Sequence, residues 1–362
     1  MRIGLFGFPK VGKTTLFNTL TGSSIPTDAY ATGKPETHIG IATVRDPRVD
    51  ALSVMFKPKK TTYAMVEYLD IVGVEKGEGA ANETFLNDLK NVDALLHVVR
   101  AFEDPALPHT QGKIDPKRDI ETMETELILA DLAVVSRRVE KLEENVKKGG
   151  RDEDKKELEA LKKCLASLEK EIPLREVKLP DDDARRLKGY TFFSAKPLLV
   201  VLNLSESDAG KIGTAVKDFG LEAFGQRPSV SVVPVSAKIE MEITGLGAQD
   251  AASFRKDLEI EEPCLDRVIR ISYALLGLIS FFTVGEDECR AWTIVRESPA
   301  LVAAGAIHSD IARGFIRAEV LAYDDLMTAG TWNKSKEAGK LRLKGKEYVV
   351  RDGDITHFRF NT

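Results

Sequence analysis

Cysteine is scarce in this sequence, which has three cysteines among 362 residues. Cys164, Cys264 and Cys289 lie far apart and share no C-x-x-C spacing. This pattern favours neither a disulfide framework nor a zinc site, and it fits a reducing compartment. We therefore expect a cytoplasmic protein.

Long apolar runs and an excess of positive charge are also missing. No apolar run is long enough to cross a bilayer, and the apolar start at residues 2–6 stops at Gly7, which is too short for a signal peptide. The formal net charge is −5, so a nucleic-acid site would have to be a local patch. We expect no membrane association and a monomer.

Short runs of Val, Ile and Leu alternate with helical stretches in two parts of the chain. This alternation predicts an α/β domain with a mostly parallel sheet, discontinuous over residues 1–120 and 190–275. The predicted strands are 2–6, 65–72, 94–99, 198–202 and 231–234.

The segment between these parts, residues 121–189, has a different period. Apolar residues recur at spacings of three and four in two highly charged runs, and Gly149-Gly150 separates the runs. The pattern predicts an inserted antiparallel coiled-coil hairpin, and an ordinary helix pair packed on the core is the alternative. The seam residues are Ile128, Leu132, Val135, Val139, Leu142, Val146, Leu158, Leu161, Leu165, Leu168 and Ile172.

The last part, residues 276–362, is predicted to be a small β-rich domain. Strand-like runs cover 290–295, 315–321, 347–350 and 356–360, and one helix is expected near 309–313. Turns are expected at Gly345 and at Asp352-Gly353.

Residues 7–14, Gly-Phe-Pro-Lys-Val-Gly-Lys-Thr, match the phosphate-binding pattern G-x-x-x-x-G-K-[ST] between a strand and a helix. The glycines let backbone N–H groups face phosphates, and Lys13 is expected to reach the β- and γ-phosphates as a catalytic residue. The Thr14 hydroxyl is expected to bind Mg²⁺. Lys10, Val11, Gly12 and Thr15 complete the expected nucleotide contacts.

The first of two later segments that are expected to complete the site is the one from Asp70 to Gly73. Asp70 ends a predicted strand and Gly73 follows it, as in a D-x-x-G switch that holds magnesium and the γ-phosphate.

Base recognition is expected at Asn203-Leu204-Ser205-Glu206 and at Ser236-Ala237. In N-K-x-D proteins the Asp reads guanine, but here Leu204 replaces the Lys and Glu206 is one methylene longer. We therefore predict that ATP is preferred and GTP is weakly tolerated.

With these motifs, the chain resembles the YchF subfamily of Obg-like P-loop proteins over nearly its whole length. The resemblance implies ATP hydrolysis, ribosome association, a coiled-coil arm and a C-terminal TGS domain. The motifs are residues 7–15, 46–48, 70–73, 97–100, 126–132, 203–206, 234–237, 290–294, 314–319, 336–340 and 352–354.

By position, the resemblance suggests two further site residues. Thr32 corresponds to a switch threonine that closes on Mg²⁺, and an ordinary loop threonine is the alternative. Because Val74 stands where many GTPases have a water-orienting glutamine, His109 is suggested as the catalytic residue that orients water. A solvated loop histidine is the alternative.

Two features depart from the family pattern. The glycine-rich segment after Gly73 is shorter than usual, and Lys10 replaces an Asn that helps to hold potassium in related proteins. The hypothesis that follows is that hydrolysis does not depend on potassium. The alternative is that Lys10 simply faces the solvent.

A cluster of basic residues near the C-terminus suggests contact with ribosomal RNA, although a solvated charged loop is the usual meaning of such a run. The cluster comprises Lys334, Lys336, Lys340, Arg342, Lys344 and Lys346. Two rival hypotheses are a GTP-specific translation GTPase and a nucleotide-gated binding module whose hydrolysis is incidental.

Overall fold

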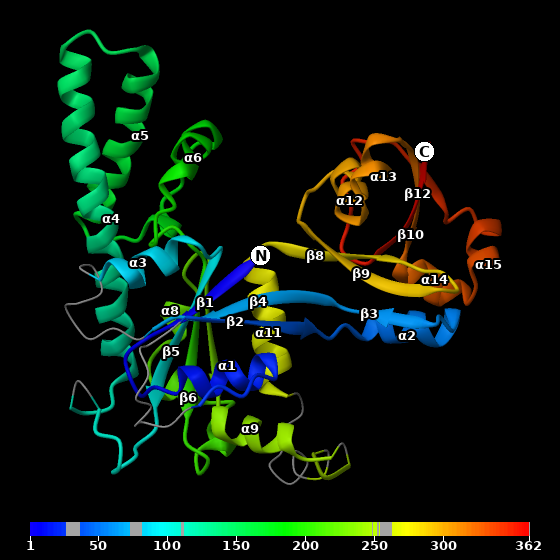
Figure 1. Ribbon diagram of the computed structural model, residues 1–362, viewed down its shortest axis with the longest axis horizontal. Helices are drawn as coiled ribbons and strands as arrows, with labels where there is room; N and C mark the ends of the chain where they lie inside the picture. Colours follow the sequence, from blue (N-terminus) through cyan, green and yellow to red (C-terminus); the bar gives the residue numbers. More distant parts are fainter. Residues whose placement is uncertain are drawn as a thin grey trace. The chain divides into compact units, whose positions relative to one another are not determined.

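Figure 1 shows a computed structural model of the chain, which describes residues 1–26, 37–72, 82–109, 112–247, 249–251, 253 and 263–361. The chain divides into two compact units. Unit 1 comprises Met1–Ile41 and Glu67–Leu275, and unit 2 comprises Ala42–Val66 and Leu276–Thr362.

Unit 1 is built on a six-stranded sheet in the order β2-β4-β1-β5-β6-β7. β1 pairs in parallel with β4 and β5, and β5–β6 and β6–β7 are also parallel. Every residue of β5 and β6 is buried, as expected for central strands of a parallel sheet. The strands are β1 Arg2–Phe6, β2 His38–Val44, β4 Ala64–Asp70, β5 Ala94–Ala101, β6 Leu198–Leu204 and β7 Val230–Val235. The predicted α/β fold is confirmed.

Helices follow most strands of this sheet. α1 packs against α9, and α11 packs against β6 and β7. The helices of this part are α1 Lys13–Thr21, α3 Glu83–Lys90, α7 Ala215–Asp218, α8 Glu222–Gly225, α9 Ala237–Gly245 and α11 Cys264–Leu275.

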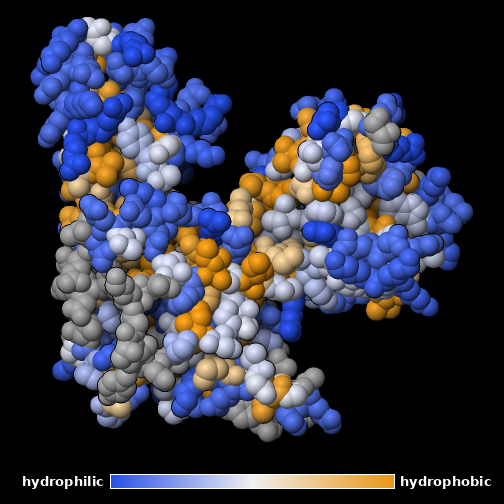
Figure 2. All heavy atoms as spheres, in the orientation of Figure 1, coloured by the Kyte–Doolittle hydropathy of each residue, from blue (hydrophilic) through white to orange (hydrophobic). Residues whose placement is uncertain are grey.

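The predicted helical hairpin is present as α4 (Pro116–Lys147) and α5 (Asp152–Leu168). Its turn uses Gly149 at φ 89°, a backbone conformation that glycine adopts readily. The seam residues share one cluster of buried or partly buried side chains, except Ile172, which lies beyond the end of α5 and is 39% exposed. Figure 2 shows a largely hydrophilic surface over the upper part of the hairpin.

A third element completes the hairpin core, which the heptad pattern alone did not predict. Leu187 at the end of α6 (Asp181–Leu187) and Phe192 belong to the same buried cluster. Buried Asp131 on α4 accepts hydrogen bonds from the backbone N–H groups of Phe193 and Ser194, at 2.9 and 2.7 Å. The base of the hairpin is therefore tied to the segment that leads into β6.

Unit 2 contains a second six-stranded sheet, in the order β11-β10-β12-β8-β9-β3. Its strands are β3 Lys60–Thr62, β8 Leu278–Thr283, β9 Glu288–Val295, β10 Phe315–Ala322, β11 Arg342–Lys344 and β12 Asp354–Phe360. Its helices are α2 Pro47–Phe56, α12 Ala300–Ile307, α13 Ser309–Arg313, α14 Tyr323–Ala329 and α15 Trp332–Glu337.

Several details differ from the sequence predictions for this part. The predicted strand 347–350 is absent, because only Val349 forms a β-bridge, with Pro299. The helix at 309–313 is confirmed, but the strands β8 and β11 and the helices α12, α14 and α15 were not predicted.

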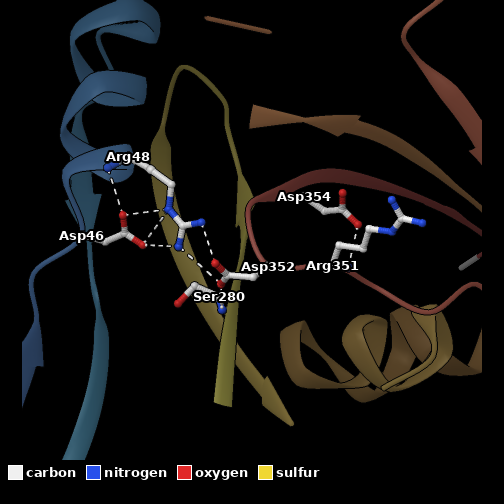
Figure 3. A network of polar contacts seen from close by, with 6 residues as sticks. All are labelled: Asp46, Arg48, Ser280, Arg351, Asp352 and Asp354. Atoms are coloured by element: carbon white, nitrogen blue, oxygen red, sulfur yellow. Dashed lines mark hydrogen bonds and ion pairs between the residues drawn. The ribbon is translucent and has the colours of Figure 1, made fainter. Parts of the chain in front are cut away.

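The grouping of Ala42–Val66 with unit 2 also differs from the expected domain boundary at 1–120. The reason is a set of long-range contacts, since β3 pairs in parallel with β9 and Arg48 bonds to Asp352. Figure 3 shows Arg48 between two carboxylates: its Nε and Nη2 donate to Asp46, and its Nη1 donates to Asp352 Oδ2 at 2.8 Å. Asp352 also accepts from the backbone N–H of Ser280 at 2.9 Å.

No helix in the described part of the chain combines the length and the apolar composition that crossing a membrane requires.

Candidate nucleotide-binding site

The loop at residues 7–12 leaves β1 and enters α1 through backbone conformations that favour glycine. Gly7 and Gly12 have φ of 145° and 91°, and Lys10 has φ 63°. A Cβ atom on Gly7 would lie 2.4 Å from the Val98 carbonyl oxygen, and one on Gly12 would lie 2.3 Å from Asn203 Nδ2. Both glycines are therefore required by the close approach of neighbouring strands.

Lys13 and Thr14 open α1, and their polar groups are turned into the site. The Lys13 ammonium, buried in the loop, donates to the carbonyl oxygens of Gly7 and Phe8 at 3.1 and 3.0 Å. The Thr14 hydroxyl donates to Asp70 Oδ2 at 2.8 Å. The structure thus brings together three predicted site residues from two elements, α1 and the end of β4.

Burial shifts the ionisation of the groups around the loop. It lowers the pKa of Lys13 from 10.5 to about 8, although Asp70 opposes the shift, and it raises the pKa of Asp70. Burial and the Lys13 charge lower the pKa of His97 on β5 to about 3, so this imidazole is neutral near pH 7. His97 stacks on Phe6 with ring centroids 4.8 Å apart. Sequence reasoning assigned His97 no role.

The predicted base-recognition segments follow β6 and β7, and Asn203 connects them to the phosphate loop. Its Nδ2 donates to the Val11 carbonyl oxygen at 2.9 Å, and its Oδ1 accepts from the Ala237 N–H at 3.0 Å. Leu204 is the last residue of β6 and its side chain is buried, while Ser236 is the N-cap residue of α9. Asn203 therefore links the end of β6 and the start of α9 to the P-loop.

Glu206 has a charged partner at this edge of the sheet. It forms an ion pair with Lys238, the second residue of α9, and the two side chains are 43% and 61% exposed. Sequence reasoning missed Lys238, although it directly follows Ser236-Ala237.

His109 is more buried than the solvated loop histidine that was the alternative to a catalytic role. Its side chain is 3% exposed, and Nε2 lies 3.0 Å from Asp119 Oδ2 on α4. Burial lowers the pKa of His109, and Asp119 opposes this shift. The structure therefore excludes a solvated loop histidine and gives His109 a buried carboxylate partner.

The other predicted residues have simple placements. Lys10 is exposed at the tip of the loop, Val11 is buried, and Thr15 lies in the first turn of α1. Thr32, Gly73 and Val74 fall outside the described residues.

The Thr14–Asp70 pair is the best candidate for a magnesium site. A hydroxyl and a carboxylate are oxygen ligands of the kind that Mg²⁺ prefers, and Mg²⁺ commonly takes few protein ligands beside substrate phosphates and water. Within the described part of the chain, no group of three or more His, Cys, Asp or Glu residues is arranged to hold a metal.

Comparison with known proteins agrees with this geometry. A family model described as a 50S ribosome-binding GTPase matches residues 2–203, and a model of the YchF C-terminal domain, described as a protein of unknown function, matches residues 278–361. The "Ribosome-binding ATPase YchF" of Haemophilus ducreyi is 43% identical and that of Bacillus subtilis 42% identical. The alignments cover 99% of this chain, and 99% and 98% of those proteins.

A solved structure, that of the Schizosaccharomyces pombe YchF GTPase, is also similar. It is 32% identical with a TM-score of 0.86, and the match covers 99% of this chain and 97% of that one. Full-length identity of this order, together with the P-loop geometry, leaves one assignment: the chain belongs to the YchF family of P-loop nucleoside triphosphatases.

Proposed function

We propose that this protein binds and slowly hydrolyses ATP with Mg²⁺, tolerates GTP weakly, and acts on the ribosome as a nucleotide-dependent switch in the cytoplasm. The observation that supports it most is the Lys13–Thr14–Asp70 arrangement at the P-loop. The relatives named ribosome-binding ATPase support the choice of nucleotide and of partner.

Catalysis in this proposal is positioning and charge neutralisation, with no covalent intermediate. The Lys13 ammonium exchanges its bonds to Gly7 and Phe8 for phosphate oxygens, and loop N–H groups face the phosphates. Thr14 and Asp70 would hold Mg²⁺, which supplies neutralisation of phosphate charge when bound. Thr32 is proposed to contact Mg²⁺ and the γ-phosphate, and the Gly73 N–H is proposed to donate to the γ-phosphate.

A competition titration of ATP against GTP with excess Mg²⁺ tests the proposed nucleotide preference. Tighter binding of ATP is expected, because Glu206 does not reproduce the guanine-reading Asp of N-K-x-D proteins. Equal or tighter binding of GTP would favour a GTPase. That second candidate has support of its own, because the family model and the S. pombe structure are both described as GTPases.

His109 is proposed to orient the attacking water, after leaving its partner Asp119. In the variant His109→Ala, turnover is expected to fall while the affinity for ATP is retained. His308→Ala is a matched control, because that histidine is exposed on unit 2. Unchanged turnover in His109→Ala would remove the residue from the mechanism.

The basic cluster near the C-terminus is proposed to contact ribosomal RNA. Five of its six residues are exposed, and the sixth, Lys344, is half-buried with its ammonium group over the Tyr348 ring. Lys334→Glu with Lys336→Glu should reduce co-sedimentation with ribosomes, and the loss should shrink as salt is raised. Unchanged co-sedimentation at low salt would contradict this contact.

A further inference from the structure

The ion pair between Glu206 and Lys238 joins the two segments that would face the base of a bound nucleotide. Glu206 follows β6, and Lys238 lies in the first turn of α9, directly after β7. β6 and β7 are parallel neighbours with Asn203 opposite Val235, so both segments leave the same edge of the sheet. In parallel α/β sheets this carboxyl edge is where ligands bind.

Asn203 fixes both segments relative to the phosphate loop. This side chain is 5% exposed and bonds at once to the Val11 carbonyl oxygen and to the Ala237 N–H. The backbone positions of Glu206 and Lys238 are therefore determined by the same residue that contacts the P-loop. The charged ends of the pair remain accessible, at 43% and 61% exposure.

We propose that Lys238 is a specificity-determining residue that disfavours guanine by occupying the Glu206 carboxylate. The inference rests on the proposed binding of a nucleoside triphosphate at the P-loop. Lys238 Nζ donates to Glu206 Oε2, and Asp104 and Glu242 add weaker attraction for the ammonium group.

The hydrogen-bonding edges of the two bases explain the discrimination. Guanine presents N1–H and N2–H₂ side by side, and a carboxylate satisfies both when its two oxygens are available. The Lys238 ammonium group takes one lone pair of Glu206 Oε2 and neutralises part of the carboxylate charge, so the carboxylate accepts less strongly from the paired guanine donors and guanine binding is weakened. Adenine presents one donor group, N6–H₂, beside the acceptor N1, so a carboxylate and an ammonium group together match it.

The pair adds little to folding, so variants of it are suitable for a binding test. Exposed ion pairs contribute little to stability because water and salt screen them. Lys238→Met keeps the length of the side chain and removes the charge, and Lys238→Arg keeps the charge as the matched control. Urea unfolding of each variant confirms that it is folded.

The experiment measures dissociation constants for ATP and GTP with excess Mg²⁺ by calorimetry in the full-length protein. In Lys238→Met, the affinity for GTP relative to ATP is expected to rise about fivefold or more, and in Lys238→Arg to stay within about twofold of the wild type. The same Lys238→Met change in a Glu206→Gln background is expected to leave the ratio unchanged, because no carboxylate is released.

Two outcomes would overturn the inference: a GTP-to-ATP ratio in Lys238→Met within about twofold of the wild type, or an equal shift in the Glu206→Gln background. Failure of the proposed ATP preference is a separate result, since it is read from the wild type alone. If the wild type binds both nucleotides equally, the change caused by Lys238→Met still decides the role of Lys238.

Discussion

At the scale of single residues, the site combines one buried cation with few polar partners. Lys13 is surrounded by loop carbonyls, neutral His97 and the Thr14–Asp70 pair. Its positive charge is poorly solvated, and this burial lowers its pKa to about 8. A phosphate-binding lysine with this pKa makes nucleotide affinity sensitive to pH above neutrality.

The affinity for ATP is expected to fall by up to about tenfold per pH unit above about pH 8, because Lys13 loses the charge that attracts phosphate. Titration calorimetry between about pH 7 and about pH 9 measures this slope. Lys13→Met should bind ATP weakly, with no such slope. A steep slope that persists in Lys13→Met would assign the titration to another group, such as Lys196, whose pKa burial also lowers to about 8.

The lowered pKa of Lys13 changes the stability of the fold with pH in the direction opposite to its effect on ATP affinity. The pKa of Lys13 is lower in the folded chain than its usual 10.5, so the unfolded chain binds more protons between these values. The Lys13 contribution to the free energy of unfolding therefore rises as pH increases from about 8 to about 10.5.

At the scale of elements, the helical hairpin shows how a heptad seam becomes a packed arm. α4 and α5 bury their seam residues, and α6 adds Leu187 to the same cluster. Arg138 on α4 donates to both carboxylate oxygens of Glu157 on α5, at 2.8 and 2.9 Å. Because the cluster shared by the arm consists mostly of buried leucines and valines, their packing is expected to supply most of its stability.

Leu161→Ala should lower the free energy of unfolding by about 2–4 kcal/mol, because Leu161 is fully buried and truncation leaves a cavity. Leu129→Ala is a matched control on α4, where Leu129 is 47% exposed, and it should cost less than about 1 kcal/mol. Urea unfolding followed by far-ultraviolet circular dichroism measures both. Equal losses in the two variants would contradict the packing described for the arm.

At the scale of the whole molecule, unit 2 is assembled from two distant parts of the sequence. Ala42–Val66 runs from the last residues of β2 to the first residues of β4, and β4 ends at Asp70 of the candidate site. Arg48 bonds to Asp352, 304 residues later in the chain. The chain segment that precedes Asp70 is thus folded against the C-terminal β-rich part.

Arg48→Met should destabilise unit 2 by about 1–2 kcal/mol, because the mostly buried Asp46 carboxylate and the more exposed Asp352 carboxylate lose their shared donor. Both tryptophans of the chain, Trp292 and Trp332, belong to unit 2, so tryptophan fluorescence during urea unfolding reports on it.

Lys59→Met is the control for this change. Lys59 also joins Ala42–Val66 to a C-terminal aspartate, Asp287, but both side chains are at least 80% exposed, and no measurable change is expected. A similar urea midpoint for Arg48→Met and the wild type would show that the Arg48 contacts add nothing to unit 2.

Local patterns determined much of this protein. The strand–loop–helix order around residues 7–14 and the seams of α4 and α5 depend on neighbours within a few turns, so their residue types were sufficient to predict them. The full-length resemblance to the YchF subfamily was likewise visible in short motifs and is confirmed by the comparisons.

The tertiary structure decided which distant groups meet. The pairing of β3 with β9, the burial of His109 against Asp119, and the ion pair of Glu206 with Lys238 join segments whose own patterns carry no sign of the partner. Such contacts depend on strand order and on the path of the chain between the elements, and local side-chain periodicity encodes neither.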